Sequence, residues 1–206
     1  MQLAMRSLCF LLLALCFASA PILSLAQSPA LTSPPPSFAE KIPLHGIPNA
    51  AKVSDRLFRG AQPALSALPQ LQALGITTIV DLRLESPRTR EHERHRAESL
   101  GLRFVHIPVG DFSTPSSAQL AQFFSLFRET PPQKIFVHCN FGEARTGVFI
   151  ASYRIAFQHW TAEQALAEMR AFGFHSHWHP AMITFVRELP TRLQSDSTLK
   201  AVLSAP

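Results

Sequence analysis

The sequence is poor in several residue types that define common classes of protein. Of its 206 residues, only three are cysteines, one is a tyrosine and four are aspartates. Cys9 and Cys16 lie in an apolar N-terminal segment, and removal of that segment would leave Cys139 as the only thiol. A single thiol cannot form an intramolecular disulfide, which excludes the class of exported proteins held together by disulfides. We therefore expect Cys139 to be a reactive group rather than a structural cross-link.

Residues 1–26 have the features of a secretory signal peptide. Arg6 is their only charged residue, the stretch from Leu8 to Ala18 is apolar, and Ser24-Leu25-Ala26 offers small residues at which a signal peptidase cuts. The alternative is an uncleaved membrane anchor, but Pro21 and the serines interrupt the apolar run, and a membrane span needs about 20 apolar residues. We expect the mature protein to be exported and to have no stable membrane association once the leader is removed.

Basic residues are not concentrated in any part of the chain. The formal net charge is +5 at pH 7, a mild excess that fits an anionic substrate without demonstrating one. The sequence contains no basic run, which argues against nucleic acid as a partner. Its densest charged stretch mixes both signs, the pattern of a solvated helix face. In that stretch Arg88, Arg90, Arg94 and Arg96 are interleaved with Glu91, Glu93 and Glu98.

The most informative stretch runs from Val137 to Gly147 and reads Val-His-Cys-Asn-Phe-Gly-Glu-Ala-Arg-Thr-Gly. An apolar, β-branched run precedes it, and apolar residues at helical spacing follow it. This order predicts a strand, a tight loop and a helix. Within the loop, five residues separate Cys139 from Arg145, so the segment has the pattern Cys-x5-Arg-Thr-Gly.

The chemistry of this loop favours an anion site. A short loop that closes onto the start of a helix directs several backbone N–H groups inward, and the helix dipole strengthens their field. The same field favours a thiolate at Cys139, and the Arg145 guanidinium can grip two oxygens of an anion at once. Gly142 permits close approach of the backbone. The competing interpretation makes Cys139 a buried apolar residue and Arg145 the cap of a turn; His138 and Thr146, on either side, favour the anion site.

The order of the remaining segments predicts a single α/β domain with a central, mostly parallel sheet flanked by helices. Residues 27–49 are expected to be a Pro/Ser-rich linker, residues 50–193 the domain and residues 194–206 a flexible tail. The expected strands cover residues 53–59, 76–83, 102–109 and 135–137, and the expected helices cover residues 64–73, 89–100, 117–129, 148–156, 161–172 and 180–193. Thr161 and Gln164 have the spacing of a capping box.

The sequence resembles the dual-specificity side of the protein tyrosine phosphatase superfamily, above all its compact bacterial members and the atypical plant and fungal ones. The resemblance covers about residues 50–190, and only His138 to Gly147 is diagnostic of chemistry. Three other stretches carry it: Leu57-Phe58-Arg59-Gly60-Ala61-Gln62-Pro63, Ile79-Val80-Asp81-Leu82-Arg83, and Tyr153-Arg154-Ile155 with Trp160 and Glu168-Met169. It implies the protein tyrosine phosphatase fold and a phosphatase that needs neither metal nor cofactor. Together with the leader, it implies a location in the bacterial periplasm or outside the cell.

The resemblance also implies roles for individual residues. Cys139 would be the nucleophile that takes the phosphoryl group as phosphocysteine, Arg145 would bind that group, and Thr146 would stabilise the thiolate as it leaves. His138 would support the loop from behind. The oxygens of the substrate, a phosphorylated protein or a small phosphomonoester, would be bound by the backbone N–H groups of Asn140, Phe141, Gly142, Glu143, Ala144 and Arg145. The implied substrates are phosphotyrosine and, as a further expectation, phosphoserine and phosphothreonine.

The general acid of this family is an aspartate on a loop upstream of the cysteine. Asp111 lies on a loop after a predicted strand, where that acid is expected. Asp55 and Asp81 lie in strand contexts too far upstream, and Asp196 lies in the expected tail. The alternative for Asp111 is a turn cap, since aspartate readily accepts hydrogen bonds from nearby backbone amides.

Two departures from the family pattern bear on the substrate. Tyr153, the only tyrosine, follows the loop, so the upstream tyrosine that deepens the pocket of the strictly tyrosine-specific members is missing. This implies a shallower site. Phosphoinositide-directed members have lysines inside the loop, whereas this chain has Asn140 and Glu143, and a carboxylate there would repel a polyphosphorylated ring. Ala144 stands where a related subset has Asp, with no predicted consequence.

Three further interpretations stay open from the sequence. His175, His177 and His179 have spacing that would allow a metal site on a strand, but no acidic or cysteine ligand adjoins them, and a polar loop near the active face is favoured. The alternative enzyme is a rhodanese-like sulfurtransferase, which also uses a loop cysteine. From another class, a non-catalytic phosphate-binding module would keep the loop without turnover.

Overall fold

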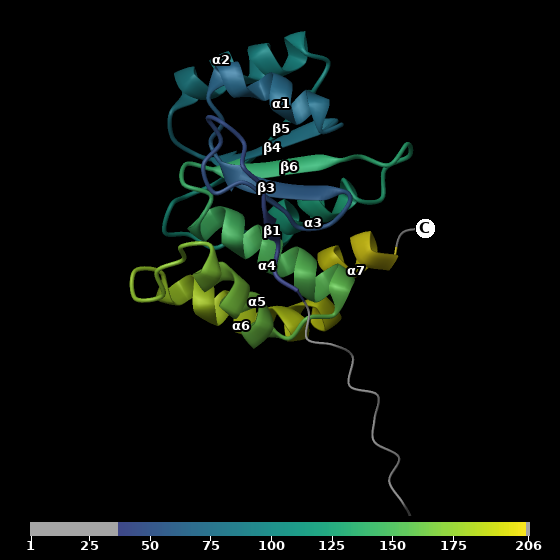
Figure 1. Ribbon diagram of the computed structural model, residues 1–206. Helices are drawn as coiled ribbons and strands as arrows, with labels where there is room; N and C mark the ends of the chain where they lie inside the picture. Colours follow the sequence, from purple (N-terminus) through teal and green to yellow (C-terminus); the bar gives the residue numbers. More distant parts are fainter. Residues whose placement is uncertain (1–36, 205–206) are drawn as a thin grey trace, which may run out of the picture. The chain divides into compact units, whose positions relative to one another are not determined.

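The computed structural model describes residues 37–204 (Figure 1). The expected signal peptide and its cleavage site lie outside the described residues. Six strands form one sheet in the order β1-β2-β3-β6-β4-β5. The strands are β1 (Glu40–Lys41), β2 (Ala51–Lys52), β3 (Leu57–Ala61), β4 (Thr78–Arg83), β5 (Arg103–Val109) and β6 (Ile135–Cys139).

Most of the sheet is parallel, as the sequence predicts. Strands β3, β6, β4 and β5 pair in parallel, and only β1 and β2 add antiparallel pairing at the β3 edge. Strand β6 lies between β3 and β4, with Cys139 beside Ala61 and His138 beside Asp81. The loop after β6 therefore leaves the middle of the sheet at its carboxyl edge, where parallel sheets place their binding sites.

Helices cover both faces of this sheet (Figure 1). One face carries α1 (Leu68–Ala73) and α2 (Pro87–Ser99). A short 3-10 helix, Leu65–Ala67, precedes α1. The other face carries α3 (Ser117–Ser125), α4 (Ala144–Gln158), α5 (Ala162–Ala171), α6 (Pro180–Ser195) and α7 (Ser197–Ser204). Within residues 37–204, none of these helices combines the length and apolar character needed to cross a membrane.

Two apolar cores result, one on each face, because strand side chains alternate between faces. On β4, Ile79 packs into the smaller core under α1 and α2, while Val80 packs into the larger core under α3 to α6. On β6, Phe136 and Val137 divide in the same way. A fully buried aliphatic or aromatic side chain contributes about 1.5–3 kcal/mol, so each core stabilises the sheet from its own side.

The N-terminal boundary of the domain differs from the expected residue 50. Strand β1 pairs with β2, and the side chains of Ala39 and Ile47 are buried. The backbone N–H of Ala39 donates a 2.7 Å hydrogen bond to Glu168. The described part of the expected linker therefore belongs to the folded unit, because its few apolar residues find partners far along the chain.

The C-terminal end also differs from the expected flexible tail. Helix α6 runs to Ser195, and α7 follows it with Leu199 fully buried against the larger core. The Asp196 carboxylate accepts hydrogen bonds from the backbone N–H groups of Thr198, at 2.9 Å, and Leu199, at 3.2 Å. The cap at Asp196 and the buried apolar face of α7 order these residues, although their polar composition had predicted a flexible tail.

Candidate active site

The site is built at the junction of β6 and α4. Cys139 is the last residue of β6 and is almost completely buried, and Arg145 lies in the first turn of α4. Residues 140–143 form the tight turn between them. The predicted strand, loop and helix are thus confirmed, and they bring Cys139 and Arg145 to the same cavity.

Two carbonyl groups of the loop accept hydrogen bonds from neighbouring residues behind it. The Asn140 carbonyl accepts from the backbone N–H of Gln62 at 3.2 Å, and the Gly142 carbonyl accepts from Arg59 at 2.6 Å and from Asn49 at 3.1 Å. A trans peptide directs its C=O and N–H to opposite sides. The N–H groups that follow these carbonyls therefore point away from Arg59 and Asn49, as an anion nest requires.

Gly142 is required by both its backbone and its surroundings. Its φ is +70°, in the region that favours glycine. A Cβ at this position would lie 2.5 Å from the backbone carbon and oxygen of Gly60 on β3. The loop therefore packs directly on the neighbouring strand, which fixes its distance from the sheet.

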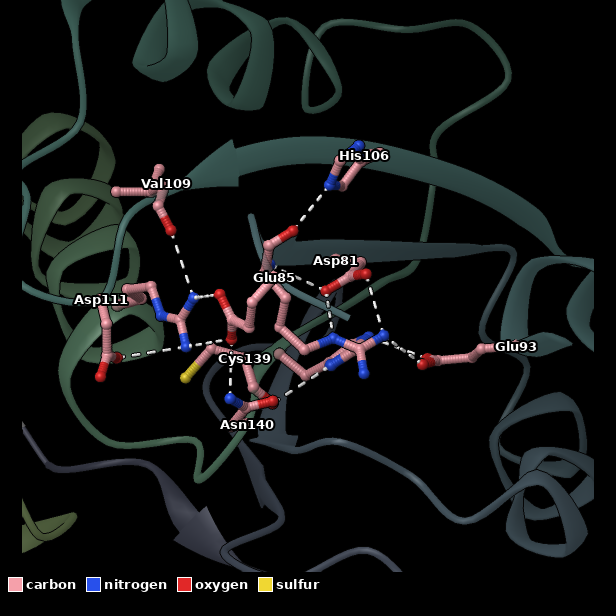
Figure 2. A network of polar contacts seen from close by, with 11 residues as sticks. Asp81, Glu85, Glu93, His106, Val109, Asp111, Cys139 and Asn140 are labelled. Atoms are coloured by element: carbon pink, nitrogen blue, oxygen red, sulfur yellow. Dashed lines mark hydrogen bonds and ion pairs between the residues drawn. The ribbon is translucent and has the colours of Figure 1, made fainter. Parts of the chain in front are cut away.

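Glu85 holds the Arg145 guanidinium at both terminal nitrogens (Figure 2). Its two carboxylate oxygens accept from Nη1 and Nη2 of Arg145 at 2.8 Å each, and Nη1 also donates to the Val109 carbonyl at 3.2 Å. The same carboxylate accepts a 2.7 Å bond from Asn140. The hydrogen bonds from Arg145 hold the pKa of Glu85 at about 2 instead of its usual 4.5. The Nε of Arg145 is buried and has no hydrogen-bond partner among the described residues.

Sequence reasoning missed Glu85, which lies in the loop after β4. Its only local signal is its place just beyond a strand of a parallel sheet, where functional groups gather.

Asp111 lies just after β5, and its side chain is half exposed. Its Oδ1 lies 3.2 Å from Nη2 of Arg145. The carboxyl ends of β4, β5 and β6 thus each supply one polar group to the same place.

The cavity above Cys139 has a volume of about 370 Å³. Among the predicted residues, Asp111, Cys139, Phe141, Glu143, Ala144 and Arg145 line it. Phe112, Phe141 and Trp178 are exposed large side chains at this cavity. Phe141 was predicted for its backbone N–H alone, and no sequence pattern singled out Phe112 or Trp178. We call Phe112, Phe141 and Trp178 the aromatic rim.

The histidine-rich segment contributes to the rim and not to a cluster of ligands. His179 stacks on Phe112 with ring centroids 5.1 Å apart, and His175 lies 5.2 Å from Trp178. Burial lowers the pKa of His179. Across residues 37–204, no group of three or more His, Cys, Asp or Glu side chains is arranged to hold a metal ion. The segment lies beside the cavity, where the polar loop near the active face was expected.

Behind the loop, the structure corrects the expectation for Glu93. The sequence pattern placed this residue on a solvated helix face, but its side chain is fully buried. It forms ion pairs with Arg83 at 2.7 Å and with His138 at 2.9 Å. His138 is also fully buried, in agreement with its expected place behind the loop. Thr146 is buried, with its hydroxyl lacking a hydrogen-bond partner.

Comparison with known proteins identifies phosphatases as relatives of this chain. Residues 45–184 match the model of the family described as "DSP-PTPase phosphatase fused to NAD+ Kinase". The chain is 29% identical over 126 residues to the dual specificity protein phosphatase TpbA of Pseudomonas aeruginosa strain UCBPP-PA14. That alignment covers 61% of this chain and 55% of the relative, so the match spans about half the length of that protein.

Solved structures show the same fold. A cysteine-to-serine variant of P. aeruginosa TpbA in complex with pTyr has a TM-score of 0.65 at 22% identity, covering 82% of this chain and 98% of that one. The catalytic core of a PP-IP phosphatase from S. cerevisiae, in complex with citrate, has a TM-score of 0.57 at 21% identity, covering 73% and 94%. The predicted resemblance is confirmed: this chain belongs to the DSP-PTPase family, on the dual-specificity side of the protein tyrosine phosphatases.

Proposed function

We propose that the domain hydrolyses phosphomonoesters, phosphotyrosine foremost, through a phosphocysteine intermediate on Cys139. The observation that carries the proposal is that the Cys139 thiol and Arg145 line one cavity. The two terminal nitrogens of Arg145 are held by Glu85, and its Nε lacks a partner. An oxyanion bound above Cys139 would accept hydrogen bonds from the Arg145 guanidinium and from the loop N–H groups.

In the first step, the Cys139 thiolate attacks phosphorus, and the bond from phosphorus to the ester oxygen breaks. Asp111 donates a proton to the leaving oxygen, and its place 3.2 Å from Arg145 puts it at the same cavity. Arg145 and the loop N–H groups bind the three remaining phosphoryl oxygens as charge develops on them.

In the second step, water attacks the phosphocysteine and the bond between sulfur and phosphorus breaks. The Asp111 carboxylate takes a proton from the water, and inorganic phosphate is released. The Thr146 hydroxyl, which is buried and has no hydrogen-bond partner in the free protein, is available to donate to the departing thiolate. Neither step calls for a metal, because the loop supplies the positive field.

The cavity walls favour an aryl phosphate over a polyphosphorylated ring. The aromatic rim offers apolar faces to the phenyl group of phosphotyrosine. Glu143 also lines the cavity, and its carboxylate would repel additional phosphate groups. One of the compared structures is a complex with pTyr and the other is a PP-IP phosphatase, and the rim supports the first substrate class for this chain.

The test is an assay of the purified protein against phosphotyrosine peptide, phosphoserine peptide, nitrophenyl phosphate and an inositol polyphosphate, with a chelator present. We expect turnover of the aryl phosphates and its loss in Cys139→Ser, which keeps vanadate binding because the loop is intact. Turnover of thiosulfate instead would favour the sulfurtransferase, and phosphopeptide binding without turnover would favour the non-catalytic module. Full activity of Cys139→Ser would exclude the cysteine mechanism.

We also propose that the protein is exported to the periplasm or the medium after cleavage behind Ala26. The support is the sequence of residues 1–26 alone. N-terminal sequencing of exported material is expected to begin at Gln27. An intact leader on protein recovered from the cytoplasm would contradict both the location and the single-thiol argument.

A further inference from the structure

Two glutamates at the Cys139 loop differ in how the protein balances their charge. Glu85 accepts two hydrogen bonds of 2.8 Å from Arg145 and one of 2.7 Å from Asn140. Glu143 lines the cavity and is only partly exposed. Within residues 37–204, no basic nitrogen lies within 4.0 Å of its carboxylate, and no donor forms a hydrogen bond with it. Because charged side chains that leave water are usually paired, Glu143 carries an unbalanced charge at the cavity wall.

The Glu143 side chain is placed by packing rather than by an ion pair. It lies against the backbone of Gly173, in the turn after α5. A Cβ at Gly173 would lie 3.0 Å from Cγ, Cδ and Oε1 of Glu143. Gly173 lines the same cavity. The absence of a side chain at this glycine therefore leaves room for the Glu143 carboxylate and keeps it at the cavity.

The other charged groups at the cavity do not offset Glu143. Among the residues of the described part of the chain that line the cavity, Arg145 is the only lysine or arginine. Glu85 and Asp111 already lie within ion-pair distance of it, at 2.8 and 3.2 Å. His179 also lines the cavity, but burial lowers its pKa, so the ring is neutral at pH 7. The wall at Glu143 is therefore negative, although the whole chain has a net charge of +5.

The aromatic rim suits a planar cation better than an anion. Phe141 and Trp178, 69% and 61% exposed, line the same cavity as Glu143. The face of an aromatic ring is the negative end of its quadrupole, so it attracts a cation. A guanidinium can pair with a carboxylate and also stack on a ring, which an ammonium group does less well.

We propose that Glu143 is a specificity-determining residue that selects phosphotyrosine with an arginine beside it in the substrate chain. With the phosphate on the Cys139 loop, the phenyl ring extends to the aromatic rim, and the neighbouring side chains of the substrate reach the cavity wall. An arginine there pairs with Glu143 and stacks on the rim, whereas a glutamate there is repelled. This selectivity rests on the proposed function, because it requires the phosphate to bind at the Cys139 loop.

The alternative role for Glu143 is to shape the loop through its contact with Gly173. Replacing a residue that only shapes the loop affects all substrates alike. Replacing a residue that pairs with the substrate changes the ratio between substrates of different charge. That ratio, taken within one protein, is independent of any change in the absolute rate.

The test uses three phosphotyrosine peptides that differ only in the two residues flanking phosphotyrosine, which are both Arg, both Gln or both Glu. In wild type, kcat/KM is expected to be about fivefold higher for the Arg peptide than for the Gln peptide, and about fivefold lower for the Glu peptide. In Glu143→Gln the three values are expected to agree within about twofold. Glu188→Gln, which removes the same charge from an exposed position on α6, is expected to keep the wild-type ratios. Equal values in wild type, or wild-type ratios in Glu143→Gln, would overturn the proposal.

A binding measurement separates this selectivity from catalysis. Dissociation constants of the same peptides are measured with Cys139→Ser, alone and combined with Glu143→Gln. The affinities are expected to follow the order Arg, Gln, Glu in steps of about fivefold, and the steps are expected to disappear in the double variant. That order without hydrolysis by wild type would contradict only the cysteine mechanism. Equal affinities, or binding of none of the peptides, would overturn selection by Glu143 whether or not wild type hydrolyses them.

Discussion

At the scale of residues, the site combines two kinds of arginine contact. Glu85 occupies the terminal nitrogens of Arg145 and fixes the plane of the guanidinium, while Nε keeps an unsatisfied N–H. With five N–H donors, the planar group can bind its positioning carboxylate and a substrate oxygen at the same time. An ammonium group has no such division of donors.

Arg145→Lys is therefore expected to be nearly as damaging as Arg145→Ala. Lysine keeps the charge but cannot satisfy Glu85 in two places and present a further donor in the same plane. We expect turnover of nitrophenyl phosphate to fall about a hundredfold or more in both variants. The control is Arg187→Lys, an exposed arginine on α6 that pairs with Glu163. A lysine variant within a few-fold of wild type would show that charge alone is sufficient.

At the scale of elements, the sequence predicts what local patterns determine. The β6 strand, the loop and the start of α4 follow from residues adjacent in the chain, and the Thr161–Gln164 capping box is confirmed with bonds of 2.8 and 3.2 Å. Glu85 and Glu93 could not be predicted, because each acts on a partner from a different element. In sequence, Glu93 resembles its exposed neighbours Glu91 and Glu98, and only the packing of α2 on the sheet separates it from them.

The seating of the loop on β3 predicts a specific effect of Gly142→Ala. The new Cβ would need both a strained backbone and a shift of the Gly60 backbone, only 2.5 Å away. Gly101 is the matched control: its φ is +74°, but no atom lies within 4 Å of a Cβ there. Gly101→Ala is expected to cost about 1–2 kcal/mol from its backbone conformation alone. Gly142→Ala is expected to lower Tm further, by several degrees more, and to abolish most activity. Equal Tm losses in the two variants would contradict a close contact between loop and strand.

At the scale of the whole molecule, stability and site geometry are linked through Glu85. Its pKa of about 2 in the folded protein lies below the usual 4.5 because Arg145 donates to it. A carboxyl group with a lowered pKa stabilises the folded state above pH 4.5, and that contribution is lost as pH falls toward 2. The Glu85 side chain is 39% exposed, so solvent screens the pair and the contribution is modest.

Wild type is expected to have a Tm a few degrees above that of Glu85→Gln at pH 7, and the difference is expected to shrink as the pH is lowered from 5 toward 3.5. The measurement is a series of thermal melts across that range. Glu188→Gln, which replaces an exposed carboxylate on α6, serves as the control and is expected to track wild type. A difference between wild type and Glu85→Gln that stays constant with pH would show that the Glu85 charge does not stabilise the fold.

The account depends most directly on phosphate passing through Cys139. Rapid-quench experiments with ³²P-labelled nitrophenyl phosphate test this in wild type and in Asp111→Asn. The variant lacks the base for the second step, whereas the first step proceeds without an acid because nitrophenolate leaves readily as an anion, so the intermediate is expected to accumulate. The label is expected on the Cys139 peptide, in an amount approaching one per protein in the variant, and it is expected to be absent from Cys139→Ser. Turnover of the substrate with no labelled protein, or with the label on another residue, would contradict the account.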